Sequence, residues 1–226
     1  PNTSNEGVAP LGVASLSTIA IDEGCDVRYF ETSFYRMSNA AYEERKKTGE
    51  FKQFTDDIFD IQPRARLEPD FLKLLDDYKP DILAVHANSL EWELFLDIMN
   101  AIGLKKRPFV LVGGCHPTVD AEGTINSKHV DAICVGEGEK PWRRFLKAFH
   151  AGADVSTIGG LWVKTETGIR KNPIADLMSA EEAPELINTQ SEAATIGADD
   201  FELQIEAETE SIEETNEILV SFLSEA

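Results

Sequence analysis

Apolar and polar positions alternate in blocks along this chain, and the blocks predict a series of strands and helices. Short apolar runs that turn residues bound are typical of buried parallel strands, and three such runs occur at Ile82–His86, Phe109–Val112 and Ala132–Val135. Apolar residues three or four positions apart predict amphipathic helices instead, at about residues 11–23, 71–78, 90–102, 118–127 and 141–151.

Turn and capping residues set the expected ends of these elements. Pro10 precedes the first helix and Gly24 follows it, and Ser89 is placed to cap the helix that begins at Leu90. Between the first two helices, Asp26–Phe30 has the composition of a strand. Helix and strand then alternate to residue 151, which predicts a doubly wound α/β fold with a parallel sheet and helices on both faces.

This order also implies a strand before the first helix, which residues 1–10 do not resemble, so the first strand is expected to be missing. After Gly160, two short runs flank Thr165–Gly168 and predict an appended hairpin. The expected organisation is therefore an α/β domain at residues 1–158, a hairpin and linker at 159–184, and an acidic tail at 185–226.

Charge is spread unevenly along the 226 residues, whose formal net charge is −20. The last basic residue is Lys171, and residues 172–226 hold 15 of the 41 acidic residues. Such a surface argues against nucleic acid as a partner, because phosphate binding needs clustered Lys and Arg. Within the tail, Phe201–Ala207 alternates like a strand and Ile212–Leu223 could form an acidic amphipathic helix, although disorder is an equal alternative.

The cysteines and the hydrophobic runs favour a cytoplasmic protein. Cys25, Cys115 and Cys134 form an odd set without metal-binding spacing, which fits a reducing compartment. No apolar run approaches the roughly 18 residues of a membrane span, and no CxxxCxxC motif for an iron–sulfur cluster occurs. Residues 31–66 are mixed and polar, with a possible helix at Ala40–Lys47.

The candidate ligand site is the edge of the sheet where two strands end in glycine. Gly113-Gly114 follows one strand and Gly136-Glu137-Gly138-Glu139 follows the next, and ligands of open α/β sheets bind at this carboxyl edge. Glycines let a bulky ligand approach the backbone, whereas the two glutamates would repel phosphate. The alternative is a pair of tight turns whose glutamates only complement a helix dipole.

Other side chains near this edge have competing interpretations. His116 could contact a ligand, ligate a metal or cap a helix, but no HxH or HExxH spacing supports a metal site. His86 either borders a cavity or, as the favoured reading, is a hydrogen-bonded residue at a strand end. Ser89 is explained fully by capping, and Cys115 has no visible base that would activate it.

Several of these motifs together resemble one family, the cobalamin-binding domain of cobalamin-dependent radical SAM enzymes, such as the anaerobic magnesium-protoporphyrin IX monomethyl ester cyclase. The two specific pieces are Val112–Thr118 (VGGCHPT) and Asp131–Glu139 (DAICVGEGE). Weaker matches are Pro10–Gly12, Lys79–Ile82, Gly159–Trp162 and Arg170–Pro173.

The resemblance implies a flavodoxin-like, Rossmann-like sheet that holds cobalamin at its carboxyl edge. Carried over motif by motif, the cofactor-binding residues would be Leu11, Gly12, Ser89, Leu90, Gly113, Gly114, His116, Pro117, Thr118, Gly136, Glu137, Gly138 and Glu139. A neutral macrocycle rich in amides needs bare backbone, hydroxyls and hydrogen-bond acceptors, and these positions offer all three.

Two departures from the family pattern limit what is expected of this chain. The DxHxxG motif, whose His ligates cobalt in methionine synthase-like corrinoid proteins, is absent, so no residue is expected to bind the metal. Met178–Pro184 and the acidic tail stand where the family continues into its catalytic barrel. We therefore expect a cobalamin-binding module, truncated or split from a radical SAM partner and serving methyl transfer; the alternative is a ligand-free interaction module that acts through the tail.

Overall fold

The computed structural model describes residues 11–36, 62–103 and 107–177. Its α-helices are α1 (Leu11–Asp22), α3 (Leu67–Tyr78), α4 (Ser89–Ile102), α5 (Cys115–Val119), α6 (Ala121–Asn126) and α7 (Glu139–His150). Its strands are β1 (Tyr35–Arg36), β2 (Gln62–Pro63), β3 (Ile82–His86), β4 (Phe109–Gly113), β5 (Ala132–Cys134), β6 (Leu161–Thr165) and β7 (Gly168–Lys171). Short 3-10 turns lie at Thr32–Phe34, Arg64–Arg66 and Val155–Thr157.

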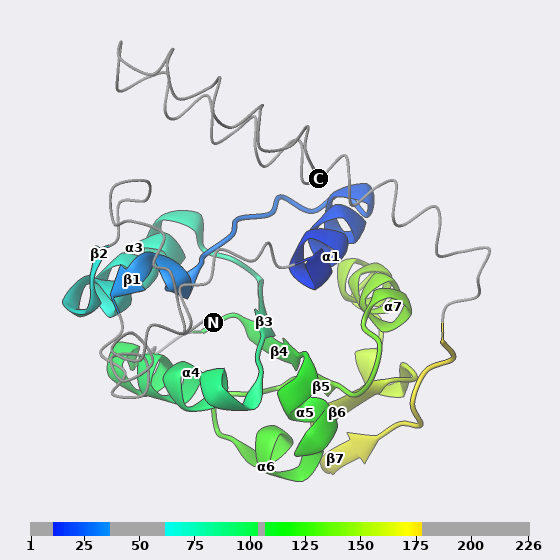
Figure 1. Ribbon diagram of the computed structural model, residues 1–226. Helices are drawn as coiled ribbons and strands as arrows, with labels where there is room; N and C mark the ends of the chain where they lie inside the picture. The colour runs from blue at the N-terminus through cyan, green and yellow to red at the C-terminus, as the bar shows by residue number, and fades with distance from the viewer. Residues whose placement is uncertain (1–10, 37–61, 104–106, 178–226) are drawn as a thin grey trace, which may run out of the picture. The chain divides into compact units, whose positions relative to one another are not determined.

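The main sheet has five strands in the order β3-β4-β5-β6-β7 (Figure 1). The first three are parallel, as the apolar runs predicted, and helices connect them. The predicted hairpin is present and extends this sheet, because β6 pairs antiparallel with β5, with Leu161 opposite Cys134. The doubly wound α/β class is thus confirmed, with a mixed sheet in place of an all-parallel one.

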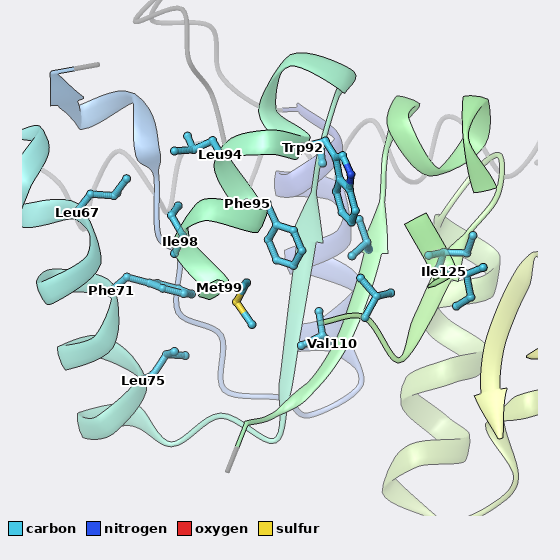
Figure 2. Close-up of a cluster of buried hydrophobic side chains, with 14 of the residues drawn as sticks. Leu67, Phe71, Leu75, Trp92, Leu94, Phe95, Ile98, Met99, Val110 and Ile125 are labelled. Atoms are coloured by element: carbon cyan, nitrogen blue, oxygen red, sulfur yellow. The ribbon is translucent and has the colours of Figure 1, made fainter. Parts of the chain in front are cut away.

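Strands β4 and β5 lie in the buried interior of the sheet, and β4 packs on both faces. Val110 and Val112 belong to a cluster with residues of α3 and α4, which Figure 2 shows beside the strands. Phe109 faces the other way, with its ring centroid 5.4 Å from that of Phe145 on α7. Because both of its faces are covered, β4 is a continuous apolar run rather than an alternating one.

Helix α1 packs beside α7 and runs in the same direction (Figure 1). In the middle of α1 the Leu16 carbonyl accepts a hydrogen bond of 2.9 Å from Trp142 Nε1, and just after its end Glu23 accepts one of 2.8 Å from Arg143. Gly24 ends the helix with a φ of 83°, as predicted. This pairing brings the beginning of α1 to the same sheet edge as the beginning of α7.

The structure corrects three predicted elements. Asp26–Phe30 is not a strand, because no strand pairs with it among the described residues; its Asp26 carbonyl and Phe30 ring contact Tyr78 and Phe71 of α3 instead. The crossover at residues 118–127 consists of two short helices, α5 and α6, divided at Asp120. The N-cap of α4 is Asn88 rather than Ser89, which is the first helical residue.

Some predictions fall outside the described residues: the helix at Ala40–Lys47, the strand at Phe201–Ala207 and the helix at Ile212–Leu223. The chain divides into two compact units, Pro1–Met178 and Ser179–Ala226, and every described residue lies in the first. None of the helices described here has both the length and the apolar character needed to cross a bilayer.

Candidate functional site

The two glycines that end β4 have different structural roles. Gly114 has a φ of 103°, and a Cβ there would lie 2.7 Å from the Ala87 carbonyl oxygen, so this turn requires glycine. Gly113 has no such constraint. A Cβ on Gly113 would meet, among the described residues, only the Cβ of Cys134 at 3.9 Å, which is ordinary contact. Gly113 thus tolerates a Cβ, whereas Gly114 does not.

Thr118 joins the two glycine turns. Its hydroxyl donates a 3.1 Å hydrogen bond to the Gly114 carbonyl and accepts a 3.1 Å hydrogen bond from the Gly136 amide. The turns after β4 and β5 are therefore fixed relative to each other at one edge of the sheet. The sequence predicted that they share this edge, but not that a side chain links them.

The second turn leads directly into α7 and faces the beginning of α1. Gly136 has a φ of 88°, and a Cβ on it would lie 3.3 Å from Ile174 Cγ2. A Cβ on Gly138 would lie 3.6 Å from a Leu16 methyl group, and one on Gly12 would meet nothing within 4 Å. Glu137 is exposed, and Glu139 is the first residue of α7. Gly12, with the Leu11 backbone at the start of α1, therefore borders the same edge.

His116 lies below this edge rather than on its surface. Its side chain is buried, as is that of Pro117, and its ring stacks on Trp92 with the centroids 4.8 Å apart. Its Nδ1 lies 3.2 Å from the exposed Ser89 hydroxyl. His116 can thus orient Ser89, while Leu90, the next residue, exposes 80% of its surface. The structure brings these residues to the start of α4, where that helix meets the carboxyl edge of the sheet with its two glycine turns.

Two buried polar atoms near the helices of this edge lack hydrogen-bond partners within the described part of the chain. They are Ser15 Oγ on α1 and Nε2 of His116. Buried polar atoms are normally satisfied, and an unpaired one costs about 1–3 kcal/mol.

His86, at the end of β3, packs over Gly114. Its Cδ2 and Nε2 lie 3.1 Å from the position that a Gly114 Cβ would take. Partial burial lowers the pKa of the His86 imidazole below its ordinary value. The imidazole has no hydrogen bond to the residues that the structure describes, which favours the interpretation that His86 borders the site.

The thiols and the acidic groups near this edge do not form a reactive centre. Burial, followed by the charge of Glu139, raises the pKa of Cys134 to about 12, so this thiol stays protonated. Cys115 is exposed. Within residues 11–36, 62–103 and 107–177, no three His, Cys, Asp or Glu side chains are grouped to hold a metal ion. A separate polar pocket, lined by Asp154 and the β6–β7 turn, lies at the opposite end of the sheet.

The donors and spaces at the carboxyl edge fit a neutral ligand that carries many amides. Exposed backbone at Gly12 and Gly136 and half-buried backbone at Gly113 allow a large, flat molecule to approach closely. The Ser89 and Thr118 hydroxyls offer polar contacts, and the glutamates of the second turn offer acceptors but disfavour phosphate. The sequence analysis did not predict that Asn88 caps α4 or that Thr118 links the two turns. The spacing of Asn88 and Glu91, three residues apart, is that of a capping box and was the signal for the first of these.

Comparison with known proteins gives three similarities. The family described as the B12 binding domain matches residues 50–146. The uncharacterized methyltransferase PH0819 of Pyrococcus horikoshii is 28% identical over 118 residues, covering 51% of this chain and 26% of that protein.

Among solved structures, the radical S-adenosylmethionine methyltransferase TsrM from Kitasatospora setae, with its tryptophan substrate and a SAM analogue bound, aligns with a TM-score of 0.54. The identity is 18%, over 76% of this chain and 29% of that one. TsrM with cobalamin and a [4Fe-4S] cluster bound aligns with a TM-score of 0.52, at 19% identity over 79% and 28%. At these identities the likeness shows the fold, and this chain spans less than a third of each of these relatives.

Proposed function

We propose, from the match of residues 50–146 to the B12 binding domain family, that this chain is the cobalamin-binding module of a radical SAM-type enzyme. Cobalamin is the cofactor of this domain, and the likeness to the family inferred from the sequence motifs is confirmed. In this proposal the module is truncated or split from its catalytic domain and presents the corrinoid for methyl transfer or related radical chemistry.

The observation that carries the proposal is the pair of glycine turns that Thr118 joins. Gly113 and Gly136 present backbone without side chains on two neighbouring strand ends, at a spacing that the Thr118 hydroxyl fixes. A macrocycle can rest against both turns only if they do not move independently. Preformed sites bind more tightly because less ordering is needed on binding.

The residues at this edge would hold and orient the cofactor. Gly12, Gly113, Gly136 and Gly138 would line its approach, Ser89 and Thr118 would offer hydroxyls, and Glu137 and Glu139 would accept hydrogen bonds from amides. Leu90, Val119 and Ile174, which expose 80%, 81% and 65% of their surfaces, would cover its apolar parts and exclude water. When bound, the cobalt of cobalamin carries the methyl group that is transferred.

His116 and Trp92 support this surface from below. Their stacked rings fix the imidazole, and the imidazole in turn orients the Ser89 hydroxyl. Such a supporting layer keeps the Ser89 hydroxyl in place, because the rotamer of a supported side chain is set by packing rather than by the ligand. Methyl transfer itself would require the radical SAM catalytic domain, and that domain would select the substrate.

The proposal is tested by cobalamin uptake. The purified full chain, incubated with hydroxocobalamin and passed through gel filtration, should retain a corrin absorption spectrum. Replacement Gly113→Leu should abolish retention while the far-UV circular dichroism and the melting temperature stay close to those of the wild type, because a Cβ at this position makes only ordinary contact with Cys134.

Ala101→Leu is a matched control, since it adds bulk at an exposed position at the other end of α4. Failure of the wild-type chain to retain the corrin spectrum would refute the cofactor claim. Equal retention by Gly113→Leu would place the site elsewhere on the molecule.

A further inference from the structure

Charged side chains meet at the amino edge of the sheet, at the opposite end of β4 and β5 from the glycine turns. Arg107 lies two residues before β4, Asp131 directly precedes β5, and Lys164 belongs to the neighbouring strand β6 (Figure 1). The Lys164 amide donates a 2.8 Å hydrogen bond to the Asp131 carbonyl. Arg107 binds the Asp131 carboxylate through both terminal nitrogens, with Nη2 2.7 Å from Oδ1. Three residues far apart in the sequence thus form one charged centre that the cobalamin proposal does not use.

Positive charge exceeds negative charge at this centre. The Asp131 carboxylate is paired with Arg107, which leaves it no capacity to neutralise a second cation. The Lys164 ammonium group donates a 2.6 Å hydrogen bond to the Ser127 carbonyl, and no carboxylate of the described residues forms an ion pair with it. Lys128, the residue after Ser127, is exposed and also has no ion pair within the described part of the chain. Three cations therefore stand against one carboxylate.

His129 lies beside these cations and is held by Asn100 in the last turn of α4. Its Nε2 lies 2.9 Å from Asn100 Oδ1. An amide oxygen can only accept a hydrogen bond, so Nε2 donates, and Nδ1 has no hydrogen bond to the residues that the structure describes. Burial, followed by the charges of Lys128, Arg107 and Lys164, lowers the pKa of the imidazole. A negative charge placed among these cations would reverse their effect, and protonation would then make Nδ1 a donor.

We propose that this basic cluster binds a phosphate group, either as the free dianion or as a phosphate monoester. Its members are Arg107, Lys128, His129 and Lys164. The two ammonium groups and the His129 Nδ1 donate to the phosphate oxygens, and such charge-assisted hydrogen bonds are about twice as strong as neutral ones. Arg107 stays on Asp131 and contributes its charge. A dianion balances the two positive charges that Asp131 leaves uncompensated, which a single chloride does not.

An NMR titration of the His129 imidazole in the full chain tests the proposal. Its pKa is measured from the Cε1–H shift between about pH 5 and pH 8, in sodium phosphate and in sodium chloride of equal ionic strength. Screening by salt acts alike in both solutions, whereas bound phosphate should raise the pKa by at least about 0.5 unit, because a nearby negative charge favours the protonated ring. His86, at the opposite edge, should have the same pKa in both. Equal pKa values for His129 in the two solutions would overturn the proposal.

Two substitutions make the test specific. Lys128→Gln removes an exposed cation that has no ion pair to lose, and it should weaken phosphate binding by at least about threefold, as measured by the chemical-shift titration. Lys164→Gln should weaken it as well, and because this change also removes the hydrogen bond to Ser127, its melting temperature is measured in parallel. Lys73→Gln on α3 removes an equally exposed cation and is the matched control. Phosphate affinity that Lys128→Gln leaves unchanged would contradict the proposal.

A second ligand distinguishes the two sources of the phosphate group. The same titration is repeated with glycerol 3-phosphate, a simple monoester. Tighter binding of the monoester than of inorganic phosphate would assign the site to a phosphorylated small molecule, and equal or weaker binding would assign it to the free ion; both results support the proposal. Hydroxocobalamin uptake, measured separately, should be unchanged in Lys128→Gln, because the glycine turns lie at the other edge of the sheet. Failure of either proposal therefore leaves the other intact.

Discussion

At the scale of single residues, Thr118 has the largest consequence for the site. It is an ordinary polar residue in the sequence, yet its hydroxyl satisfies both a carbonyl of the first glycine turn and an amide of the second. Gly113 and Gly114 also differ in a way that the sequence conceals. A Cβ at Gly114 collides with backbone, whereas one at Gly113 makes only ordinary contact with Cys134, so of these two glycines Gly113 is the better probe of binding.

Replacement Thr118→Val should separate the two turns. The change keeps the shape of the side chain but leaves the Gly136 amide without its partner, which should lower the free energy of unfolding by about 1–2 kcal/mol. Hydroxocobalamin retention should fall as well, measured by spectral titration. The matched control is Thr165→Val, which removes the 2.8 Å hydrogen bond to the Gly168 carbonyl in the distant hairpin. If both variants retain the cofactor equally, the link between the turns is unimportant for binding.

Asp131 predicts how the stability of the fold depends on pH. Burial opposes ionisation of its carboxyl group, but hydrogen bonds from Arg107 and from the Val110 amide outweigh burial and hold its pKa below the ordinary value. A depressed pKa stabilises the folded state above the unfolded pKa of about 4, and this contribution is lost as the pH falls through the folded value.

Urea unfolding of the wild type should therefore show a loss of stability below about pH 4 that Asp131→Asn does not show. At pH 7 the same variant should be less stable by about 1.5–3 kcal/mol, because hydrogen bonds to a charged group are lost. Parallel pH profiles for the two proteins would exclude this role for Asp131.

At the scale of elements, the start of α4 shows how a single residue shift changes an interpretation. Asn88 accepts hydrogen bonds from the amides of Leu90 and Glu91, and Glu91 accepts one from the Asn88 amide. Ser89, expected to be the cap, is thereby free to point its hydroxyl toward His116. The cap belongs to Asn88, and Ser89 belongs to the candidate site.

This distinction gives opposite expectations for two neighbouring substitutions. Asn88→Ala should lower the free energy of unfolding by about 1 kcal/mol, the usual cost of losing an N-cap, as measured by urea denaturation. Ser89→Ala should cost less stability but weaken hydroxocobalamin retention. The reverse pattern would return the capping role to Ser89 and remove it from the site.

At the scale of the whole molecule, the candidate site is contained in the first compact unit, Pro1–Met178. The acidic tail belongs to the second unit, and residues 172–226 contain no basic side chain. A chain that ends at Met178 should therefore retain hydroxocobalamin with the affinity of the full chain, measured by spectral titration. Loss of binding on truncation would bring the tail into the site. The alternative is an interaction module that acts through its tail. It would be favoured if the chain did not bind cobalamin and if a partner protein were pulled down only when residues 185–226 were present.

The sequence by itself determined the local elements and the edge at which to search. Ile82–His86 is a strand at the predicted bounds. The observed helix Leu11–Asp22, which ends before Gly24, and the observed hairpin around Thr165–Gly168 also agree with the prediction. These features depend on residues close together in the chain, namely apolar runs, turn glycines and amphipathic spacing. The same local patterns, at Val112–Thr118 and Asp131–Glu139, led to the cobalamin-binding family.

Only the tertiary structure decided which of these elements pair and which side chains meet. Asp26–Phe30 has the composition of a strand but is not one, because a strand needs a neighbour to complete its hydrogen bonds. The hairpin joins the main sheet because β6 finds the free edge of β5, and His116 turns inward because Trp92, 24 residues earlier in the chain, offers its ring. Each of these outcomes rests on contacts between distant residues, which local sequence patterns do not contain.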